Sequence, residues 1–353
     1  MAGKSPTPLR VGLHLRVGFD LAVPIATQID EAADLVGFAA SLGVFHTLRV
    51  PHRWLADPPV LEPLLLLARL APAAGPMRLM TSVMKPPIHN PVELAHQVAT
   101  LDQICHGRFD FGVGLGWPLA EFAAIGAPRS ERVARFEESL ALMKLLWTGE
   151  QVSFEGRFWS VNGERMGYVP VQRPHPPLWV GALSVPASQR AARVADGLIL
   201  SSQSTWKDAA IYAATYRAET DGLGRRRGSV GIERELSVAQ DEGRANEAAR
   251  ARRVERAGQA YNPEERVGRG HEAAVERDPG SYSLVGRPST CVETIQRERE
   301  AIGFDLLSLS FANSPRELSA RKDYLQLVAE EVLRPAGAGE SPGLESAPKP
   351  AAR

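Results

Sequence analysis

The chain of 353 residues is poor in cysteine, in net charge and in long apolar runs. Its 2 cysteines, Cys105 and Cys291, are too few for a disulfide framework and form no Cys-x-x-Cys motif, so we expect a reducing, cytoplasmic compartment. Lysine and arginine number 41, as do aspartate and glutamate, so no overall positive field exists to attract a nucleic acid. The apolar stretch 61–70 is interrupted by charge and proline and is too short to cross a membrane, and we expect no signal peptide.

Motifs of several enzyme classes are also missing. The chain contains no P-loop, no Gly-x-Ser-x-Gly motif and no His-Glu-x-x-His motif. Its 8 histidines do not have metal-ligand spacing, so we expect no metal site. Gly112, Gly114 and Gly116 resemble part of a dinucleotide fingerprint, but Trp117 stands where that fingerprint needs its last glycine.

Short apolar segments alternate with amphipathic ones along most of the chain. This alternation predicts strands at residues 9–15, 47–50, 78–83, 109–113, 178–180, 198–200, 230–238 and 306–309, with helices between them. About eight strands that alternate with helices favour an α/β fold, a closed (β/α)8 TIM barrel, over an open doubly wound sheet.

We expect one domain over residues 9–333. Residues 150–177 break the alternation and contain Asn162-Gly163, a strong hairpin motif, so we predict an insertion over the carboxyl-terminal face of the strands. Residues 261–280 are polar and charged, which predicts a mobile loop. Proline, glycine, alanine and serine dominate residues 334–353, which predicts a disordered tail.

In a (β/α)8 barrel the loops that follow the strands carry the chemistry. His52 and Trp54 follow the second predicted strand, and they suit proton exchange and stacking on a planar ligand. The alternative is a half-buried loop histidine. Ser82, Val83 and Lys85 lie at the end of the third strand, where small and β-branched residues suit a bulge against a flat ring, or a simple strand terminus.

Two further loops are candidates for cofactor binding. Gly112, Gly114 and Gly116 follow the fourth strand, and they either let a ligand approach the backbone or serve as thin packing inside the barrel. The loop after residues 178–180 leads into a helix whose free N–H groups and dipole suit a phosphate, unless its serine is only an N-cap. The residues of this loop are Gly181, Ala182, Ser184 and Val185.

A set of short motifs extends over most of the chain. The motifs are NP at 90–91, ATLD at 99–102, GRF at 107–109, GVGLGW at 112–117, EF at 121–122, LWTGE at 146–150, FEGRF at 154–158, PVQRPHPPL at 170–178, AARVADG at 191–197, VGRP at 285–288 and GFD at 303–305. Together they resemble the luciferase-like flavin-dependent oxidoreductases, which include bacterial luciferase-like monooxygenases and F420-dependent relatives. The resemblance runs over residues 9–332.

The resemblance implies a TIM barrel that binds FMN or the deazaflavin F420 at the carboxyl ends of the strands. It places a non-prolyl cis peptide behind the cofactor ring at Ser82-Val83, and it matches His52 to the active-site histidine. It also implies a substrate pocket lined by His14, Trp54 and Trp117. The residues expected to contact the cofactor are Ser82, Val83, Lys85, Gly114, Gly116, Gly181, Ala182, Ser184 and Val185.

Three positions depart from the pattern of the family. Pro51 replaces the acidic residue that usually precedes the histidine. Trp117 stands where one F420-dependent branch has a catalytic glutamate, so sugar-phosphate chemistry is not expected. Leu115 replaces the arginine that binds phosphate in true luciferases, so light emission from long aldehydes is not expected either.

The preferred hypothesis is an FMNH2-dependent monooxygenase that uses O2, a separate flavin reductase and a small organic substrate, with His52 as the acid or base. One alternative is an F420-dependent reductase or dehydrogenase that moves a hydride to or from C5 of the deazaflavin. A second alternative is a non-catalytic flavin-binding member. We expect no nucleic-acid or membrane partner, and the resemblance implies a homodimer.

Overall fold

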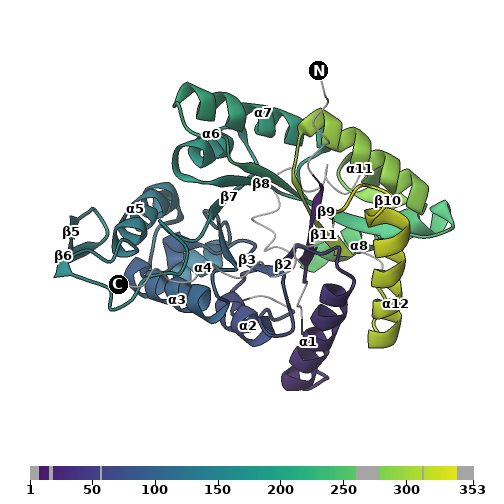
Figure 1. Cartoon of the computed structure of the whole chain (residues 1–353), viewed down its shortest axis with the longest axis horizontal. Coiled ribbons are helices and arrows are strands. Elements are labelled where there is room, and N and C mark those ends of the chain that lie inside the picture. The colour runs from purple at the N-terminus through teal and green to yellow at the C-terminus, as the bar shows by residue number, and fades with distance from the viewer. Residues whose placement is uncertain (1–7, 16–18, 56–57, 260–277, 312–313, 340–353) are drawn as a thin grey trace.

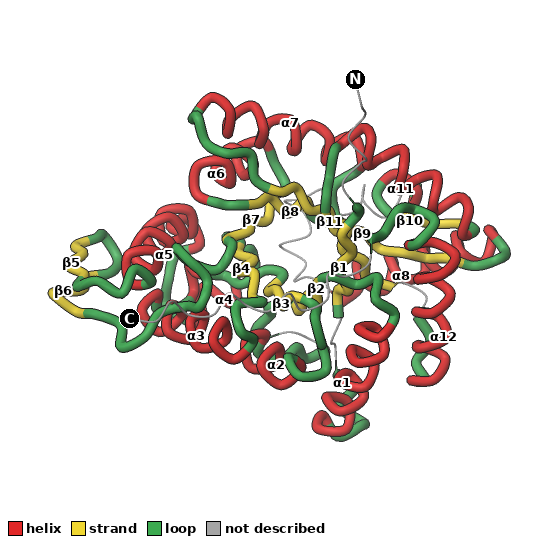
Figure 2. Tube along the Cα trace, in the orientation of Figure 1, coloured by secondary structure: helices red, strands yellow, loops and turns green. Residues whose placement is uncertain are grey.

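Eight parallel strands close into a barrel in the computed structural model, which describes residues 8–15, 19–55, 58–259, 278–311 and 314–339 (Figures 1 and 2). Around the barrel the strands follow the order β1-β2-β3-β4-β7-β8-β9-β11, and β11 pairs with β1. Their bounds are β1 (Arg10–His14), β2 (Thr47–Val50), β3 (Arg78–Thr81), β4 (Phe109–Val113), β7 (Leu178–Ala182), β8 (Gly197–Leu200), β9 (Ser229–Val238) and β11 (Leu306–Phe311). The predicted (β/α)8 barrel is confirmed.

Helices surround the barrel, as Figure 2 shows in red. The main ones are α1 (Ile25–Ser41), α2 (Pro63–Leu70), α3 (Pro91–Ile104), α5 (Arg132–Leu146), α6 (Val185–Val194), α7 (Trp206–Gly222), α8 (Glu242–Gln259), α11 (Pro288–Ile302) and α12 (Leu318–Val328). Shorter elements are η1 (Pro86–Ile88), α4 (Leu119–Ala124), η2 (Arg129–Glu131), η3 (Pro279–Ser281), η4 (Ala329–Leu333) and β10 (Leu284–Gly286), which pairs with the end of β9. Within the described ranges, no helix has the length and apolarity that crossing a membrane requires.

The strands are buried on both faces, which explains why they are short apolar runs in the sequence. Every residue of β2, β4 and β8 is buried. Inside the barrel, Met80, Trp179, Ile199 and Leu306 form an apolar layer. On β9 and β11, the inward-facing positions two residues beyond this apolar layer, toward the carboxyl ends of the strands, are polar. The barrel therefore has an apolar layer beneath a polar interior, and the polar part lies toward the carboxyl ends of the strands.

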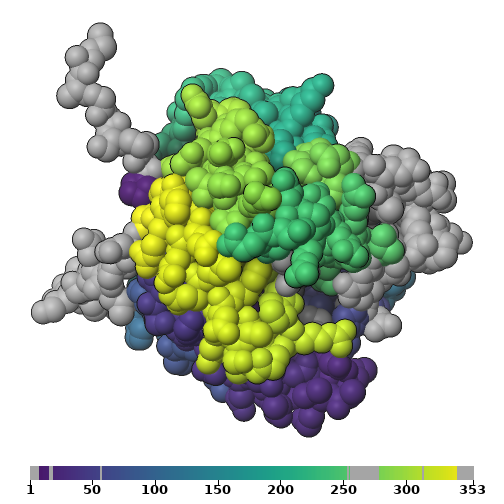
Figure 3. Space-filling model, turned by 90° about the vertical axis from the view of Figure 1, so that its right-hand side faces the viewer, coloured from purple at the N-terminus to yellow at the C-terminus, as the bar shows by residue number. Residues whose placement is uncertain are grey.

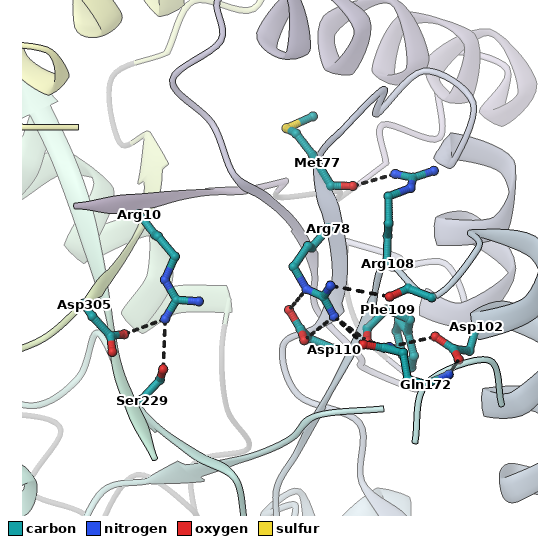
Figure 4. Close-up of polar contacts among 11 residues, drawn as sticks. Arg10, Met77, Arg78, Asp102, Arg108, Phe109, Asp110, Gln172, Ser229 and Asp305 are labelled. Carbon is teal, nitrogen blue, oxygen red and sulfur yellow. Dashed lines mark hydrogen bonds and ion pairs between the residues drawn. The ribbon is translucent and has the colours of Figure 1, made fainter. Parts of the chain in front are cut away.

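The amino end of the barrel is held by a network of charged and amide groups (Figure 4). Arg78 donates to both carboxylate oxygens of Asp110 at 2.8 Å, and its Nη2 also donates to Gln172 at 2.9 Å. Gln172 in turn donates to Asp102 at 2.8 Å and to the Phe109 carbonyl at 2.6 Å. These contacts connect β3 and β4 to the segment that leads into β7.

The insertion at residues 150–177 does not lie where the sequence analysis placed it. Its hairpin, β5 (Val152–Glu155) and β6 (Ser160–Glu164), lies outside α5, away from the barrel (Figures 1 and 2). Its turn is at 156–159, where backbone N–H groups donate to the Glu138 carboxylate at 2.7–2.9 Å, while Asn162-Gly163 lies within β6. The prediction failed because the insertion follows a helix and precedes a strand, and such connections return to the amino end of a barrel.

Residues 334–339, which the sequence analysis assigned to a disordered tail, are ordered in the structure. Leu9 donates to the Gly337 carbonyl at 3.0 Å and accepts from Gly339 at 3.3 Å, so residues 334–339 pack beside the start of β1. Small residues make this close approach feasible. Residues 340–353 lie outside the described residues, as does most of the predicted mobile loop, 260–277. In Figure 3 this side of the molecule is formed mainly by the green and yellow last third of the chain, with the purple amino-terminal part below it.

We predict that Asp110→Asn destabilises the fold by about 2–3 kcal/mol, because it removes a partly buried, bidentate hydrogen-bonded charge pair with Arg78. The change in the free energy of unfolding is measured by urea titration, with unfolding monitored by tryptophan fluorescence. The matched control is Asp30→Asn, which breaks an exposed ion pair with Arg69 and should cost less than about 1 kcal/mol. Equal losses in the two variants would contradict a stabilising role for the network.

Candidate active site

The chain after β3 forms a bend that packs against glycines of β4 and β7. The Ser82–Val83 peptide bond is cis, at the position that the resemblance implies. A Cβ on Gly114 would lie 2.7 Å from Val83 Cγ2, and a Cβ on Gly181 would lie 3.5 Å from Val83 Cγ1. Val83 therefore sits between the two glycines, and only Gly114 is required to lack a side chain for it to fit there.

The glycines of β4 and the loop after it also accommodate the rest of this bend. A Cβ on Gly112 would lie 2.0 Å from the Thr81 carbonyl oxygen. Gly116 has a φ of +73°, and its Cβ would lie 3.1 Å from Lys85 Cδ. These distances favour the packing alternative for the glycine series. Contact of Gly114 and Gly116 with a cofactor stays a prediction.

A buried ion pair lies inside the barrel next to the bend. Arg49 of β2 is fully buried, and its Nη2 lies 2.7 Å from Glu233 Oε1 and donates to Ser82 Oγ at 2.8 Å. The Ser82 hydroxyl also donates to Glu233. Burial lowers the pKa of Arg49, and the attraction of Glu233 opposes this effect. The sequence analysis assigned no role to Arg49 or Glu233, although a single charge within the apolar strand β2 is the feature that could have identified Arg49.

His52 and Trp54 form an aromatic cluster with His89, which the sequence analysis did not single out. The His52 ring lies 5.1 Å from the His89 ring and 5.7 Å from the Trp54 ring, and Trp54 lies 5.0 Å from His89. Burial first, then the charge of Lys85, lower the pKa of His52 to about 2 and that of His89 to about 4. Both rings are therefore uncharged at neutral pH. The role of His52 as an acid or base stays a prediction.

Glu121 of α4 connects the loops that carry this cluster. Its Oε1 accepts from the Trp54 backbone N–H at 2.8 Å, and its Oε2 accepts from Lys85 Nζ. Both charged groups are buried, and burial lowers the pKa of Lys85 to about 8 although Glu121 opposes the shift. One carboxylate thus holds the loop after β2 and the loop after β3 against α4. The sequence analysis placed Glu121 in a motif but gave it no function.

The remaining predicted pocket residues lie at the same end of the barrel. Trp117 follows the glycine series, and the Arg53 guanidinium lies 6.0 Å from its ring centroid. His14 is the last residue of β1, is partly buried and pairs in register with Arg49. The structure thus brings His14 and Trp117 to the carboxyl end of the barrel, and their contact with a substrate stays a prediction.

The loop after β7 forms the start of α6. Ser184 is the N-cap, because its Oγ accepts from the Ala187 N–H at 3.3 Å. Pro186 has no N–H, so the Val185 amide is the donor that the first helical positions before Ala187 offer to a ligand. Ala182 is buried in β7, whereas Val185 is exposed. Ser184 thus caps the helix, and whether the helix also binds a phosphate stays a prediction.

Comparisons with known proteins agree on one family. A family model described as luciferase-like monooxygenase matches residues 10–306. An F420-dependent glucose-6-phosphate dehydrogenase of Microbacterium testaceum is 30% identical over 267 residues, which cover 72% of this chain and 76% of the relative. The FMNH2-dependent dimethylsulfone monooxygenase of Pseudomonas putida is 36% identical over 130 residues, 36% of each chain.

An uncharacterized protein of Mycobacterium tuberculosis is 37% identical over 140 residues, 39% of this chain and 49% of the relative, so the chain spans about half the length of that relative. Among solved structures, the monooxygenase RslO1 from Streptomyces bottropensis is 26% identical, with a TM-score of 0.75 over 92% of this chain and 99% of that one.

We predict that Glu121→Gln destabilises the chain by about 3–5 kcal/mol, because it leaves the Lys85 ammonium buried without its carboxylate. The double variant Lys85→Met/Glu121→Leu removes both charges and should recover most of the loss. The denaturant midpoints of the parent, the single variant and the double variant measure the three stabilities. If the double variant were as unstable as the single one, lost packing rather than the unpaired charge would be responsible.

A second prediction concerns acid stability. The pKa of His52 is about 2 in the folded chain and about 6.5 in the unfolded chain, so only the unfolded chain binds this proton between those values. The free energy of unfolding should fall as pH drops below 6.5, with His52 contributing up to about 1.4 kcal/mol per pH unit. His52→Gln should show a shallower decline, and His96→Gln, at an exposed site on α3, should follow the parent. An unchanged slope in His52→Gln would contradict the burial argument.

Proposed function

The chain belongs to the luciferase-like monooxygenase family of flavin-dependent oxidoreductases, and we propose that it is an FMNH2-dependent monooxygenase. In this proposal a separate reductase supplies reduced FMN, O2 is the oxidant and a small organic molecule is the substrate. The Pseudomonas putida and Streptomyces bottropensis monooxygenases support the choice as relatives that match this chain.

The observation that carries the proposal is the burial of His52, which is 5% exposed and packs against His89 and Trp54. Hydride exchange between a cofactor and an alcohol works best with an acid or base whose pKa lies near the working pH. A pKa of about 2 for His52 is far from that range. Oxygen chemistry on a reduced flavin instead requires that water be kept away, which a buried aromatic cluster favours.

The residues at the carboxyl end of the barrel fit a flavin. Val83, held between Gly114 and Gly181, is only partly buried and offers an apolar surface to a planar ring. The Val185 amide at the start of α6 would hold the phosphate, with the helix dipole adding to the attraction. When bound, FMN would supply the electrons that reduce O2.

The chain's own side chains have separate tasks in this proposal. The ion pair of Arg49 and Glu233 fixes the Ser82 hydroxyl behind the ring site. Glu121 holds the Trp54 backbone and Lys85, and so keeps the aromatic cluster in place over the barrel. His52, as a neutral ring, orients the substrate by hydrogen bonding. Trp54 and Trp117 exclude water from the substrate.

F420-dependent hydride transfer is a second candidate. It is favoured by the Microbacterium testaceum dehydrogenase, whose match covers 72% of this chain. Trp117 argues against sugar-phosphate oxidation in particular, because an indole cannot act as the acid or base that a glutamate would supply at that position. The same Val83 surface and α6 amide suit either cofactor, so cofactor binding separates the candidates.

The test is an anaerobic titration of the full-length chain with reduced FMN, riboflavin and F420. We expect reduced FMN to bind more tightly than F420. Leu183→Glu adds a negative charge at an exposed site just before α6 and should weaken FMN binding about three- to tenfold while riboflavin, which lacks the phosphate, is unaffected. Leu65→Glu, at an exposed site on α2, is the matched control and should bind FMN as the parent does.

Oxygen transfer is tested with the FMN-loaded chain, a reductase with NADH as the electron donor, and ¹⁸O₂ on a panel of small sulfones and ketones. One ¹⁸O atom per product molecule is the expected result. If F420 binds more tightly and the substrate is oxidised or reduced in the absence of O2, the monooxygenase proposal is wrong and F420-dependent hydride transfer is supported.

A further inference from the structure

Three ring nitrogens in the aromatic cluster lack a hydrogen-bond partner in the part of the chain that the structure describes. They are Nδ1 and Nε2 of His52 and Nε2 of His89, and all three atoms are buried. The His52 side chain is 5% exposed. Buried polar atoms in folded proteins nearly always have a partner, so three orphaned nitrogens in adjacent rings indicate the place of a ligand.

Both rings offer hydrogen bonds without charge. The pKa of His52 is about 2 and that of His89 about 4, so each neutral ring has one N–H donor and one nitrogen acceptor. The nearby ammonium of Lys85 is paired with the Glu121 carboxylate, although its charge still lowers the pKa of both rings. The two rings therefore present two uncharged donors, with no cation of their own for an anionic ligand.

The geometry also limits the size of the group that binds there. The two ring centroids lie 5.1 Å apart with an angle of 38° between the planes. Two hydrogen bonds of about 2.9 Å can end on a single oxygen atom at this separation. Trp54 meets both rings at steep angles, 87° and 67°, and so adds an apolar wall beside them.

We propose that His52 and His89 together bind one uncharged oxygen atom of the substrate, with one N–H donated by each ring. The substrate class is then a neutral ketone, sulfone or amide. A carboxylate or sulfonate would lose its hydration and find neither ring charged, with the Lys85 ammonium already paired with Glu121 and the Arg53 guanidinium lying over Trp117, and so would bind more weakly. This inference rests on the proposed function, names the substrate class for it and makes His89 a residue that determines specificity.

The experiment uses the full-length chain with ¹³C at histidine Cε1, observed by NMR at pH 7. The probes are dimethylsulfone, cyclohexanone and methanesulfonate, which is close to dimethylsulfone in shape but carries a negative charge. We expect the two neutral probes to shift the His52 and His89 resonances with saturation. Methanesulfonate should leave both resonances unchanged.

Three variants separate the hydrogen bond from packing. His89→Phe keeps a flat ring without a donor and should weaken dimethylsulfone binding about tenfold. His89→Gln keeps an N–H donor and should retain most of the affinity. His96→Phe, on the exposed side of α3, is the control and should bind dimethylsulfone as the parent does.

Methanesulfonate binding as tight as that of dimethylsulfone would overturn the inference, as would an unchanged affinity in His89→Phe. FMN titrated into the same samples tells the two proposals apart. If the parent chain binds FMN normally but binds neither neutral probe, the proposed substrate site at His52 and His89 is wrong and the proposed function is unaffected. Probe binding in a chain that does not bind FMN would overturn the proposed function instead.

Discussion

The buried carboxylate of Glu121 is the interaction on which the arrangement of the site depends. It accepts from a side chain of the loop after β3 and from the backbone of the loop after β2, while its own position is set by α4. Loops are the most mobile parts of a barrel, yet here two of them bind to the same buried carboxylate. This shared carboxylate holds the aromatic cluster in place above the strands.

The floor of the site is held in a similar way from within the barrel. Arg49 on β2 and Glu233 on β9 are far apart in the sequence, and their pairing reaches across the interior to Ser82 after β3. Below them, the apolar layer of Met80, Trp179, Ile199 and Leu306 fills the barrel. A polar layer supported by a packed one gives a rigid surface, which is what a cofactor-binding site requires in order to hold a ring in one orientation.

The barrel and its strands could be predicted from the sequence because strands buried on both faces are continuous apolar runs between turn residues. The loops that carry His52, Ser82 and Val83 could be located for the same reason, since they follow those runs. Glu121, His89, Arg49 and Glu233 could not be assigned roles, because their partners are more than 30 residues away and no periodicity connects them. The turn of the hairpin could not be located because Asn-Gly suggests a turn wherever it occurs, whereas the Glu138 carboxylate determines where the chain reverses in this protein.

That hairpin has a consequence for how the molecule can vary. It lies against the outer side of α5, and the segment after it leads back to the amino end of the barrel, on the side opposite the aromatic cluster. The exposed positions of its strands can thus vary during evolution without disturbing the chemistry, whereas its turn is held by Glu138. Those exposed positions offer a place to attach a label at a distance from the reacting groups.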